Sequence, residues 1–554
     1  MERNKITEKP EIDIRKYPFE SFTSLYNKFE WDIPTMFNIG EAICDRHADN
    51  KARIAILYED DEGNENKYTF WDLKNKSNQL ANFLNELGVE PKERVGILLA
   101  ERPETIASFV AVYKLGGIVL SMSPLFGQDA VQYRLKDSNT KILIIEAGRK
   151  DIRQIAEKIP SLQHVIIVGE GDPSGQKEQS YDEIKNISTD YEYPQTPSEN
   201  PAHMFYTSGT TGPPKGTLHA HRFILGHIPS FQLYFELAPQ DRDVFWTPAD
   251  WGWIGALGDV VFPALYFGMP IVAHRRRGPF DPLKTLELME KHQITCAFIP
   301  PTALRMIRKT IDHPSKEYDL SLRAISSAGE SVSSDLKKWG RKALGVPINE
   351  FYGATEDNLI VVTCSAFMDG QSGAMGKPSP GQVVEVLDKE GNILPIGEIG
   401  EIGVKSPNPV LFLEYWNNAE ATKQKFKGVW FMMGDLGYKD ENGYLWFKAR
   451  ADDLIKQAGY RIGPSEVEAI INSHPAVLES GVIPKPDPIR GHKIKAFIVI
   501  KNKFQPNNEL KKEIQFLVKN KLATYAYPRE IEFIKELPKT VTGKIMRYEL
   551  RKLL

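Results

Sequence analysis

Short runs of almost continuous apolar residues recur along the first two thirds of this 554-residue chain. A strand that is apolar at successive positions is buried on both faces, which is typical of parallel sheets covered by helices. Between the runs lie segments with helical spacing, such as Leu73, Leu80, Leu84 and Leu87. This alternation predicts an α/β layer fold. The predicted strands are 54–58, 94–100, 117–120, 141–145, 164–168, 270–273 and 296–300, and 324–330 is predicted as a strand that ends in a tight turn.

The sequence pattern changes twice in the last third of the chain. From Val383 to Gly403, short apolar stretches alternate with glycine turns, which predicts a small antiparallel β region. After Arg450, about 100 residues follow with their own pattern of helices and strands, the size of an ordinary domain. We therefore predict two domains, residues 1–450 and 451–554, the second of α+β type.

Composition excludes several classes of protein. The net charge of −3 argues against a general nucleic-acid or anionic-membrane binder. Cys44, Cys296 and Cys364 are too scattered for a disulfide framework or a zinc site, and we expect buried thiols in a reducing compartment. The charged N-terminus lacks the apolar core of a signal peptide, and the most apolar window, 257–273, is short for a membrane span. A cytoplasmic enzyme without a membrane span is expected, and the oligomeric state is left open.

The segment Tyr206–Gly216, YTSGTTGPPKG, combines hydroxyl side chains, glycines and a lysine. Such a loop can wrap a polyphosphate, because glycine lets backbone N–H groups approach closely, hydroxyls donate hydrogen bonds and the lysine neutralises charge. The spacing is not that of a Walker loop, since Pro213 and Pro214 separate Gly212 from Lys215. For a generic loop of this composition, the alternative is a flexible surface turn.

The whole segment resembles the phosphate-binding loop of the AMP-forming acyl-CoA synthetases, within the adenylate-forming superfamily, and further motifs follow in the family's order. The resemblance implies a large N-terminal region of two α/β subdomains plus a small β region, with a small mobile α+β C-terminal domain. It also implies ATP, Mg²⁺ and coenzyme A as cofactors. The ATP or AMP contacts that it implies are Thr207, Ser208, Gly209, Thr210, Thr211, Gly212, Lys215, Gly329, Glu330, Ser331, Glu350, Phe351, Tyr352, Gly353, Ala354, Thr355, Asp435, Arg450, Arg461 and Lys544.

The segment Phe351–Glu356, FYGATE, resembles the family's aromatic-Gly-x-Thr-Glu motif. By this resemblance Tyr352 packs on adenine, Thr355 contacts the α-phosphate and Glu356 holds Mg²⁺. A carboxylate beside the triphosphate suits Mg²⁺, which binds through one or two carboxylates plus phosphates. The family usually continues with a glycine, whereas Asp357 and Asn358 follow here.

The resemblance also assigns roles after residue 430. Asp435 and Arg450 contact the ribose, and Asp452 is the hinge between the domains. Lys544 is the adenylation lysine, since a cation between the substrate carboxylate and the α-phosphate stabilises and aligns two anions that repel one another. The residues that it assigns to coenzyme A are Ala458, Gly459, Tyr460, Arg490 and Lys519.

Two residues are predicted to shape the acyl pocket. Trp253 lies in an aromatic-rich segment that resembles the family's segment beside the carboxylate, and is expected to form a wall. Gly353 stands where acetate-specific members carry an indole, so the pocket is predicted to accept more than two carbons.

These observations predict an AMP-forming acyl-CoA synthetase, an acid–thiol ligase, for a short- to medium-chain and possibly branched or substituted carboxylic acid. One alternative is an adenylation enzyme that loads a carrier protein or oxidises its adenylate. Another is a non-catalytic acyl or nucleotide sensor that kept the fold.

Overall fold

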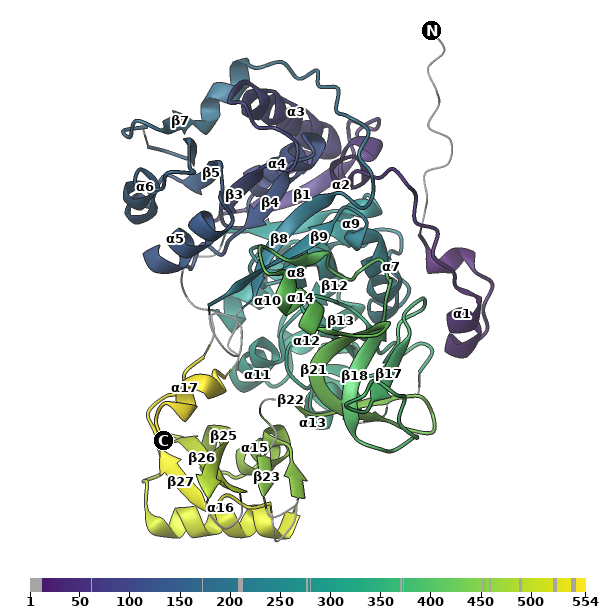
Figure 1. Ribbon diagram of the computed structural model, residues 1–554, viewed down its shortest axis with the longest axis vertical. Helices are drawn as coiled ribbons and strands as arrows, with labels where there is room; N and C mark the ends of the chain where they lie inside the picture. The colour runs from purple at the N-terminus through teal and green to yellow at the C-terminus, as the bar shows by residue number, and fades with distance from the viewer. Residues whose placement is uncertain are drawn as a thin grey trace. The chain divides into compact units, whose positions relative to one another are not determined.

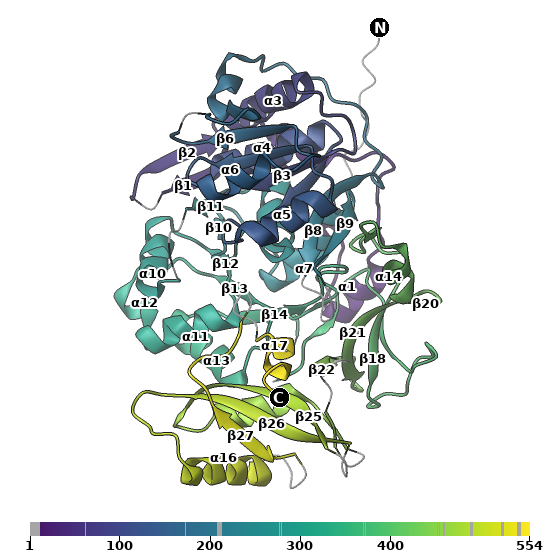
Figure 2. The ribbon, with the colours of Figure 1, turned by 60° about the vertical axis from the view of Figure 1, so that its left-hand side comes forward.

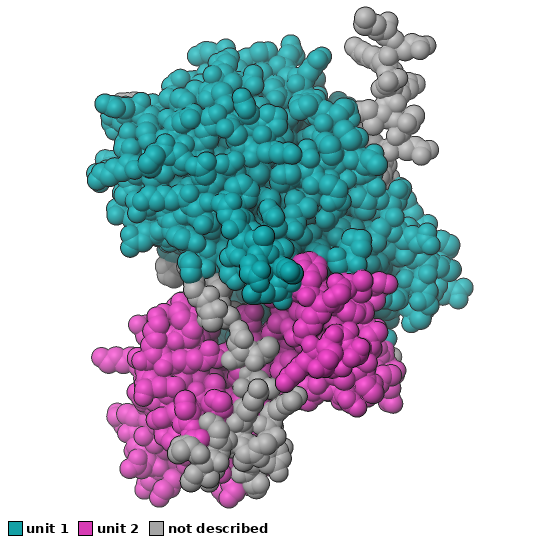
Figure 3. All heavy atoms as spheres, viewed as in Figure 1, with its two compact units in different colours: residues 1–209, 213–382, 406–424 teal, residues 210–212, 383–405, 425–554 magenta. Residues whose placement is uncertain are grey.

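The computed structural model describes residues 12–60, 62–171, 173–207, 213–275, 278, 280–368, 371, 373–450, 453, 455–457, 460–487, 491–521, 526–539 and 545–554. These residues divide into two compact units, coloured separately in Figure 3. Unit 1 holds the described parts of 1–209, 213–382 and 406–424, and unit 2 holds those of 383–405 and 425–554. The small β region thus groups by packing with the C-terminal residues, while the functional boundary at residue 450 remains a prediction.

Unit 1 contains two large sheets built mostly from parallel strands (Figures 1 and 2). The eight-stranded sheet has the order β19 (Glu414–Tyr415), β9 (Lys215–Ala220), β8 (Pro201–Thr207), β4 (Ile118–Ser121), β3 (Arg94–Leu98), β5 (Ile142–Glu146), β6 (His164–Val168) and β7 (Glu178–Ser180). The nine-stranded sheet has the order β16 (Lys377–Pro378), β15 (Val361–Val362), β14 (Ile348–Tyr352), β13 (Ala324–Ser327), β12 (Cys296–Phe298), β10 (Phe245–Trp246), β11 (Ile271–His274), β1 (Ile54–Glu59) and β2 (Glu65–Thr69).

The helices of unit 1 cover both faces of both sheets. Their bounds are α1 Phe22–Lys28, α2 Ile39–Ile43, α3 Phe70–Glu86, α4 Pro103–Lys114, α5 Gln128–Asp137, α6 Lys150–Ala156, α7 Phe223–Tyr234, α8 Ile254–Ala256, α9 Phe262–Tyr266, α10 Pro282–Lys291, α11 Pro301–Thr310, α12 Pro314–Glu317, α13 Ser334–Trp339 and α14 Ala419–Gln424. Short 3-10 turns are η1 Ile14–Lys16, η2 Asp45–His47 and η3 Tyr181–Asn186, and π-helical turns are η4 Leu257–Val261 and η5 Gly340–Leu344.

Side chains on the two faces of the buried strands pack into different hydrophobic clusters. In β3, Val95 and Ile97 join a large cluster with α3, α4, α7 and α9, while Leu98 joins a second cluster with α5 and α6. In β12, Cys296 faces the same large cluster, and Ala297 faces a third one with α10, α11 and α13. One layer of helices therefore lies between the two sheets, and the strands are buried on both faces, as the apolar runs predict.

Unit 2 contains two smaller sheets. The first is antiparallel and has the order β17 (Val384–Leu387), β18 (Gly400–Lys405), β21 (Trp430–Lys439) and β20 (Phe426–Lys427), with β22 (Leu445–Arg450) also paired to β21. The second has the order β24 (Tyr460–Ile462), β23 (Ile455–Gln457), β26 (Gly491–Ile500) and β25 (Val477–Asp487), with β27 (Glu530–Phe533) parallel to β26. Its helices are α15 Pro464–Asn472, α16 Asn508–Lys521 and α17 Arg547–Arg551.

The architecture confirms the predicted fold class. Both α/β regions, the antiparallel β region from Val384 and the α+β pattern after Arg450 are present. The apolar window 257–273 forms η4, α9 and β11 in the core, and the three cysteines are buried. In the part of the chain that the structure describes, no helix is both long and apolar enough to cross a membrane.

Candidate active site

The two motif turns of the nine-stranded sheet follow neighbouring parallel strands. Gly329 follows β13 and adopts φ +88°, a left-handed conformation that favours glycine. The FYGATE segment ends β14, which pairs in parallel with β13. Ligands of open α/β sheets bind outside the carboxyl ends of the strands, and this edge is therefore the candidate site.

A tyrosine that the motif analysis did not single out joins the two best-defined motifs. The Tyr415 hydroxyl donates a hydrogen bond of 2.5 Å to Oε1 of Glu356. Nζ of Lys215 lies 5.1 Å from the centre of the Tyr415 ring, a cation–π distance. Strand β19, which carries Tyr415, pairs with β9, which begins at Lys215. The predicted metal carboxylate and phosphate lysine are thus brought to one tyrosine, although no spacing in the sequence connects them.

The phosphate loop begins where β8 ends. Thr207 is the last residue of β8 and pairs with Lys215 across the antiparallel ladder. The rest of the predicted loop, Ser208, Gly209, Thr210, Thr211 and Gly212, lies outside the described residues. The ends of the loop are therefore held by a hairpin ladder at the carboxyl end of β8.

Two acidic residues that are predicted to contact the nucleotide form ion pairs within unit 1. Glu350 is 7% exposed, its Oε1 accepts from the Val332 backbone N–H, and its Oε2 lies 2.9 Å from Nζ of Lys337. Burial nevertheless raises its pKa, with Lys337 opposing that effect. Glu330 pairs with Arg305 at 2.8 Å. The remaining members, Ser331, Phe351, Tyr352, Ala354 and Thr355, lie on the two turns or at the end of β14.

The predicted ribose residues lie together in unit 2. Asp435 and Arg450 are directly opposite in the β21–β22 ladder, and Arg450 Nε lies 3.5 Å from Asp435 Oδ1. Asp435 is 9% exposed. A buried acidic residue beside a guanidinium can accept both hydroxyls of a ribose, the role that an acidic residue has in other nucleotide folds.

The predicted hinge, coenzyme A residues and adenylation lysine are only partly described. Asp452, Ala458, Gly459, Arg490 and Lys544 lie outside the described residues. The backbones of Tyr460 and Arg461 belong to β24, and Lys519 is exposed in the last turn of α16. Their roles remain predictions.

Buried ion pairs join residues that flank two segments outside the described residues, 451–452 and 540–544. Asp453 directly follows the predicted hinge, and Arg547 lies three residues after Lys544. Nη1 of Arg547 lies 3.4 Å from Oδ2 of Asp453, and its Nη2 donates to both oxygens of Glu468 on α15 at 2.8 and 2.6 Å. Within unit 2, Asp453, which follows the predicted hinge, is therefore tied to Arg547, which follows the predicted adenylation lysine.

The prediction that Gly353 leaves the volume of a side chain empty is wrong. A Cβ built on Gly353 would lie 2.6 Å from the backbone N of Leu359 and 2.7 Å from the Cα of Asn358. Backbone atoms cannot move aside as a flexible side chain can, so glycine is needed here for close approach of two chain segments. The residue does not leave a side-chain-sized space. Trp253 is half-buried with its ring edge-on to Phe126 at 5.9 Å, and it stays a candidate wall.

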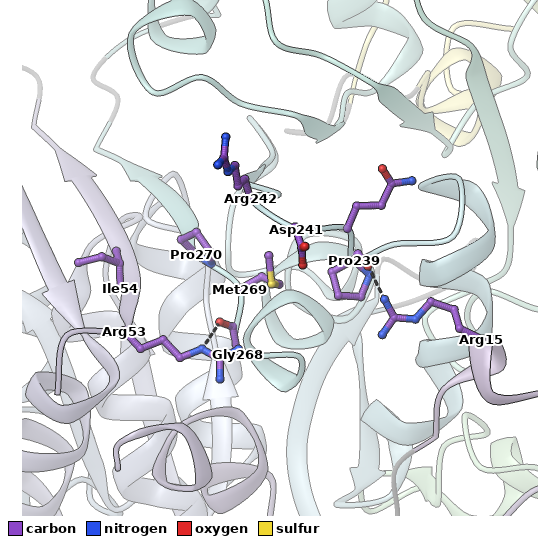
Figure 4. A pocket seen from close by; sticks show the side chains of 10 residues that line it. Arg15, Arg53, Ile54, Pro239, Asp241, Arg242, Gly268, Met269 and Pro270 are labelled. Carbon is purple, nitrogen blue, oxygen red and sulfur yellow. Dashed lines mark hydrogen bonds between the residues drawn. The ribbon is translucent and has the colours of Figure 1, made fainter. Parts of the chain in front are cut away.

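A hollow of about 460 Å³ lies elsewhere in unit 1 (Figure 4). It is lined by Ile54 at the start of β1 and Pro270 just before β11. The hollow therefore lies at the amino ends of these strands, whereas the motif turns lie at the opposite edge of the same sheet. Arg53 donates to the Gly268 carbonyl at 2.8 Å, and Arg15 donates to the Pro239 carbonyl. These arginines hold loops together, and we assign the hollow no part in the reaction.

Comparison with known proteins agrees with this geometry. Residues 43–416 match the family model described as AMP-binding enzyme, and residues 466–544 match its C-terminal domain. The chain belongs to the AMP-binding enzyme family.

The named relatives of this AMP-binding enzyme are CoA ligases. It is 36% identical over 548 residues to the acetyl-coenzyme A synthetase of Bacillus subtilis, with 96% of this chain and 95% of that protein covered. It is 35% identical over 550 residues to human acyl-coenzyme A synthetase ACSM3, mitochondrial, covering 96% and 92%. The structure of the anthranilate CoA ligase AuaEII with anthranoyl-AMP superposes with a TM-score of 0.83 at 31% identity, covering 94% and 98%.

The comparisons confirm the predicted reaction class. The family and the named relatives are AMP-forming acyl-CoA synthetases, which are acid–thiol ligases that use ATP, Mg²⁺ and coenzyme A. The residues fit such cofactors. Among the described residues, no group of three or more His, Cys, Asp or Glu side chains could enclose a metal, whereas Mg²⁺ needs only one or two carboxylates when phosphates supply the other ligands. Glu356 offers one carboxylate, already oriented by Tyr415.

Replacing Tyr415 with phenylalanine is expected to raise the Mg²⁺ concentration at half-maximal rate about tenfold, within the usual range for groups that orient a metal ligand. The substitution keeps the ring and removes the hydroxyl that holds Glu356. Initial rates across a Mg²⁺ titration at saturating ATP measure this effect. Tyr17→Phe, which removes an exposed hydroxyl contact to the Glu30 carbonyl, is the control. An unchanged Mg²⁺ dependence in Tyr415→Phe would contradict the positioning role.

Asp357, which directly follows the FYGATE segment, is fully buried. Asp357 Oδ2 accepts from Asn408 at 2.9 Å, and Oδ1 has no hydrogen-bond partner among the residues that the structure describes. Burial raises the pKa of Asp357 to about 7, and the hydrogen bond from Asn408 opposes this rise. A pKa above the ordinary carboxyl value means that folding favours the protonated form of Asp357. The contribution of this group to folding stability is therefore fully present below about pH 4, and it is lost as the pH rises through about 7.

Replacing Asp357 with asparagine should therefore reduce the pH dependence of stability. Between about pH 5 and pH 8 the melting temperature of the wild type is expected to fall by a few degrees more than that of Asp357→Asn. Calorimetry at both values measures the difference. Asp182→Asn is the control, because the side chain of Asp182 is 71% exposed. Parallel curves for the wild type and Asp357→Asn would rule out this titration.

Proposed function

We propose that this enzyme activates a short- to medium-chain carboxylic acid, a class that includes branched and substituted acids, and transfers the acyl group to coenzyme A. In the first half-reaction, a carboxylate oxygen attacks the α-phosphorus of ATP, and the bond to the pyrophosphate oxygen breaks. In the second, the coenzyme A thiol loses its proton and attacks the acyl carbon, and AMP leaves. The observation that carries the proposal is the convergence of Glu356 and Lys215 on Tyr415.

The residues of unit 1 are proposed to bind and orient the triphosphate. Lys215 neutralises phosphate charge, and the Thr355 hydroxyl donates to the α-phosphate. Glu356 holds Mg²⁺, which supplies charge neutralisation at the phosphates when bound. Tyr352 packs on the adenine. Such contacts stabilise the charge that develops at phosphorus, which is usually the largest contribution to catalysis of this kind.

The residues of unit 2 are proposed to divide between the two half-reactions. Asp435 and Arg450 hold the ribose in both. Lys544 acts in adenylation, while Gly459 and Arg461 act when the pantetheine arm enters. Because both groups follow Asp452, rotation about this residue would exchange them, as in other enzymes whose domains move about a few hinge residues.

The product distribution tests the proposal. With a suitable acid, stoichiometric release of AMP and pyrophosphate is expected, followed by thioester in the presence of coenzyme A. Stoichiometric ADP would overturn the proposed attack at the α-phosphate. Pyrophosphate exchange without thioester would favour an enzyme that loads a carrier protein, and no turnover with any acid would favour a sensor. We also propose a cytoplasmic location, supported by three buried cysteine thiols without disulfides.

A further inference from the structure

A buried polar cluster joins three elements of unit 1. Asn358 follows the FYGATE segment, His227 lies on α7, and Asp259 lies on the π-helical turn η4. Nδ2 of Asn358 donates to Oδ1 of Asp259 at 2.5 Å and lies 3.3 Å from Nε2 of His227. The three side chains belong to residues no more than 6% exposed. Within a region otherwise packed with apolar and aromatic side chains, such a cluster requires an explanation.

The hydrogen bonds define which ring nitrogen of His227 carries the proton. Nδ1 of His227 lies 2.7 Å from the backbone carbonyl of Phe223, which can only accept. Nδ1 therefore carries the proton, and Nε2 accepts from Asn358. Burial lowers the pKa of His227 to about 4, so the ring is neutral near pH 7. Both amide protons of Asn358 are then used, one by His227 and one by Asp259.

One oxygen of Asp259 remains without a partner. Oδ1 is bonded to Asn358, and no described residue donates a hydrogen bond to Oδ2. This oxygen faces Gly255, because a Cβ built on Gly255 would lie 3.5 Å from Oδ2 and 3.9 Å from the ring of Phe298. Gly255 is half-buried, so the space in front of it is lined by a carboxyl oxygen and an aromatic ring. Asp259 is 1% exposed, so a ligand that donates a hydrogen bond to its open carboxyl oxygen would be favoured over one that cannot.

The cluster lies next to the two residues that are predicted to shape the acyl pocket, Trp253 and Gly353. Gly255 is two residues after Trp253, the proposed wall. On the other side, the Cα of Asn358 lies 2.7 Å from where a Cβ of Gly353 would be. A π-helical turn such as the one that carries Asp259 is frequently found at functional sites.

We propose that Asp259, held by Asn358 and His227, binds a hydroxyl group at the far end of the carboxylic acid, so that the preferred substrates are short hydroxy acids. This inference rests on the proposed function. A hydroxyl can donate to Oδ2 when Asp259 is ionised and accept from it when Asp259 is protonated, whereas a methyl group can do neither.

An ammonium group suits the site less well than a hydroxyl. It has three donors, and the groups that face Asp259 offer it no second anionic partner. His227 is neutral, the Tyr234 hydroxyl is occupied by donating to the Asp259 carbonyl at 2.5 Å, and Phe298 is apolar. Burial also raises the pKa of Asp259 well above its ordinary range, which disfavours the ion pair that an ammonium would need.

Matched pairs of substrates test the inference. Pyrophosphate release would be measured with propanoic to hexanoic acids, with their ω-hydroxy derivatives and with their ω-amino derivatives. For the best chain length, we expect kcat/KM for the hydroxy acid to exceed that of the methyl-ended acid of equal length by roughly 10- to 100-fold, because an unsatisfied buried polar group is costly. In Asp259→Leu this ratio is expected to fall by a similar factor, with the change mainly in KM.

Two further variants keep the test informative if Asp259→Leu does not fold. Asp259→Asn keeps the size and the oxygen bonded to Asn358, and should lower the ratio less than Asp259→Leu. Gly255→Ala adds one methyl group at ordinary contact distance and should lower kcat/KM for the hydroxy acid more than for a shorter methyl-ended acid.

The outcomes separate this inference from the proposed function. Pyrophosphate release that is equal or faster with methyl-ended acids, or a ratio unchanged in the Asp259 variants, would overturn the hydroxyl site and leave the acyl-CoA synthetase proposal intact. Preference for the ω-amino acids would overturn the hydroxyl assignment. No pyrophosphate release with any acid would overturn both proposals.

Discussion

Replacing Lys544 with alanine is expected to slow acyl-adenylate formation by about 100- to 1000-fold, the usual cost of removing one group that stabilises transition-state charge. The lysine is proposed to lie between the substrate carboxylate and the α-phosphate, two anions that repel one another. It has no proposed role once the adenylate has formed. The variant should therefore still convert supplied acyl-AMP and coenzyme A into thioester.

Single-turnover assays of the two half-reactions measure this division. Pyrophosphate release reports adenylation, and thioester formation from synthetic acyl-AMP reports the second step. Lys535→Ala is the matched control, since it removes an exposed lysine nine residues earlier in the same unit. If Lys544→Ala lost both half-reactions equally while remaining folded, the proposed division of labour would be wrong.

The parts of the fold that the sequence predicts well depend on local patterns. Val95 and Ile97 face one core and Leu98 the opposite one, and this burial on both faces is what an uninterrupted apolar run indicates. Thr69 caps α3 in a capping box with Asp72. The α+β pattern that is predicted after Arg450 is also present.

The parts that the sequence does not predict depend on contacts between distant segments. Tyr415 reaches Glu356 only because β19 pairs with β9. The surroundings of Gly353 depend on how closely the backbone at Asn358 returns, which no spacing reveals. Asp259 lies in an apolar window that predicts core, and its partner Asn358 is 99 positions away. Chemical roles that arise from such contacts require the three-dimensional structure.

Replacing Arg547 with alanine is expected to destabilise unit 2 by about 3 kcal/mol, at the lower end of the range for breaking a buried ion pair, because its partners are partly exposed. The side chains of Asp453 and Glu468 are 11% and 10% exposed. Without the Arg547 guanidinium, Glu468 loses its ion-pair partner, while Asp453 keeps its pair with Arg551. Glu468 also accepts from the Val482 backbone N–H at 2.7 Å, so the expected loss of stability extends to its contact with β25.

Arg547→Ala should slow adenylation by more than its loss of folding stability explains. Lys539 and Ile545 form an antiparallel bridge on either side of residues 540–544, and Arg547 anchors the chain just after that bridge to the residue that follows the hinge. Without this anchor, Lys544 should no longer move as one body with Asp453, and thioester formation from acyl-AMP should be affected less. Arg551→Ala is the control, because Arg551 contacts Asp453 but is 31% exposed and does not pair with Glu468 in the described contacts. Thermal unfolding and the two single-turnover assays, all run at a temperature where both variants are folded, separate the effects. An Arg547→Ala enzyme with wild-type stability and wild-type adenylation would show that the ion pairs neither stabilise the unit nor position the lysine.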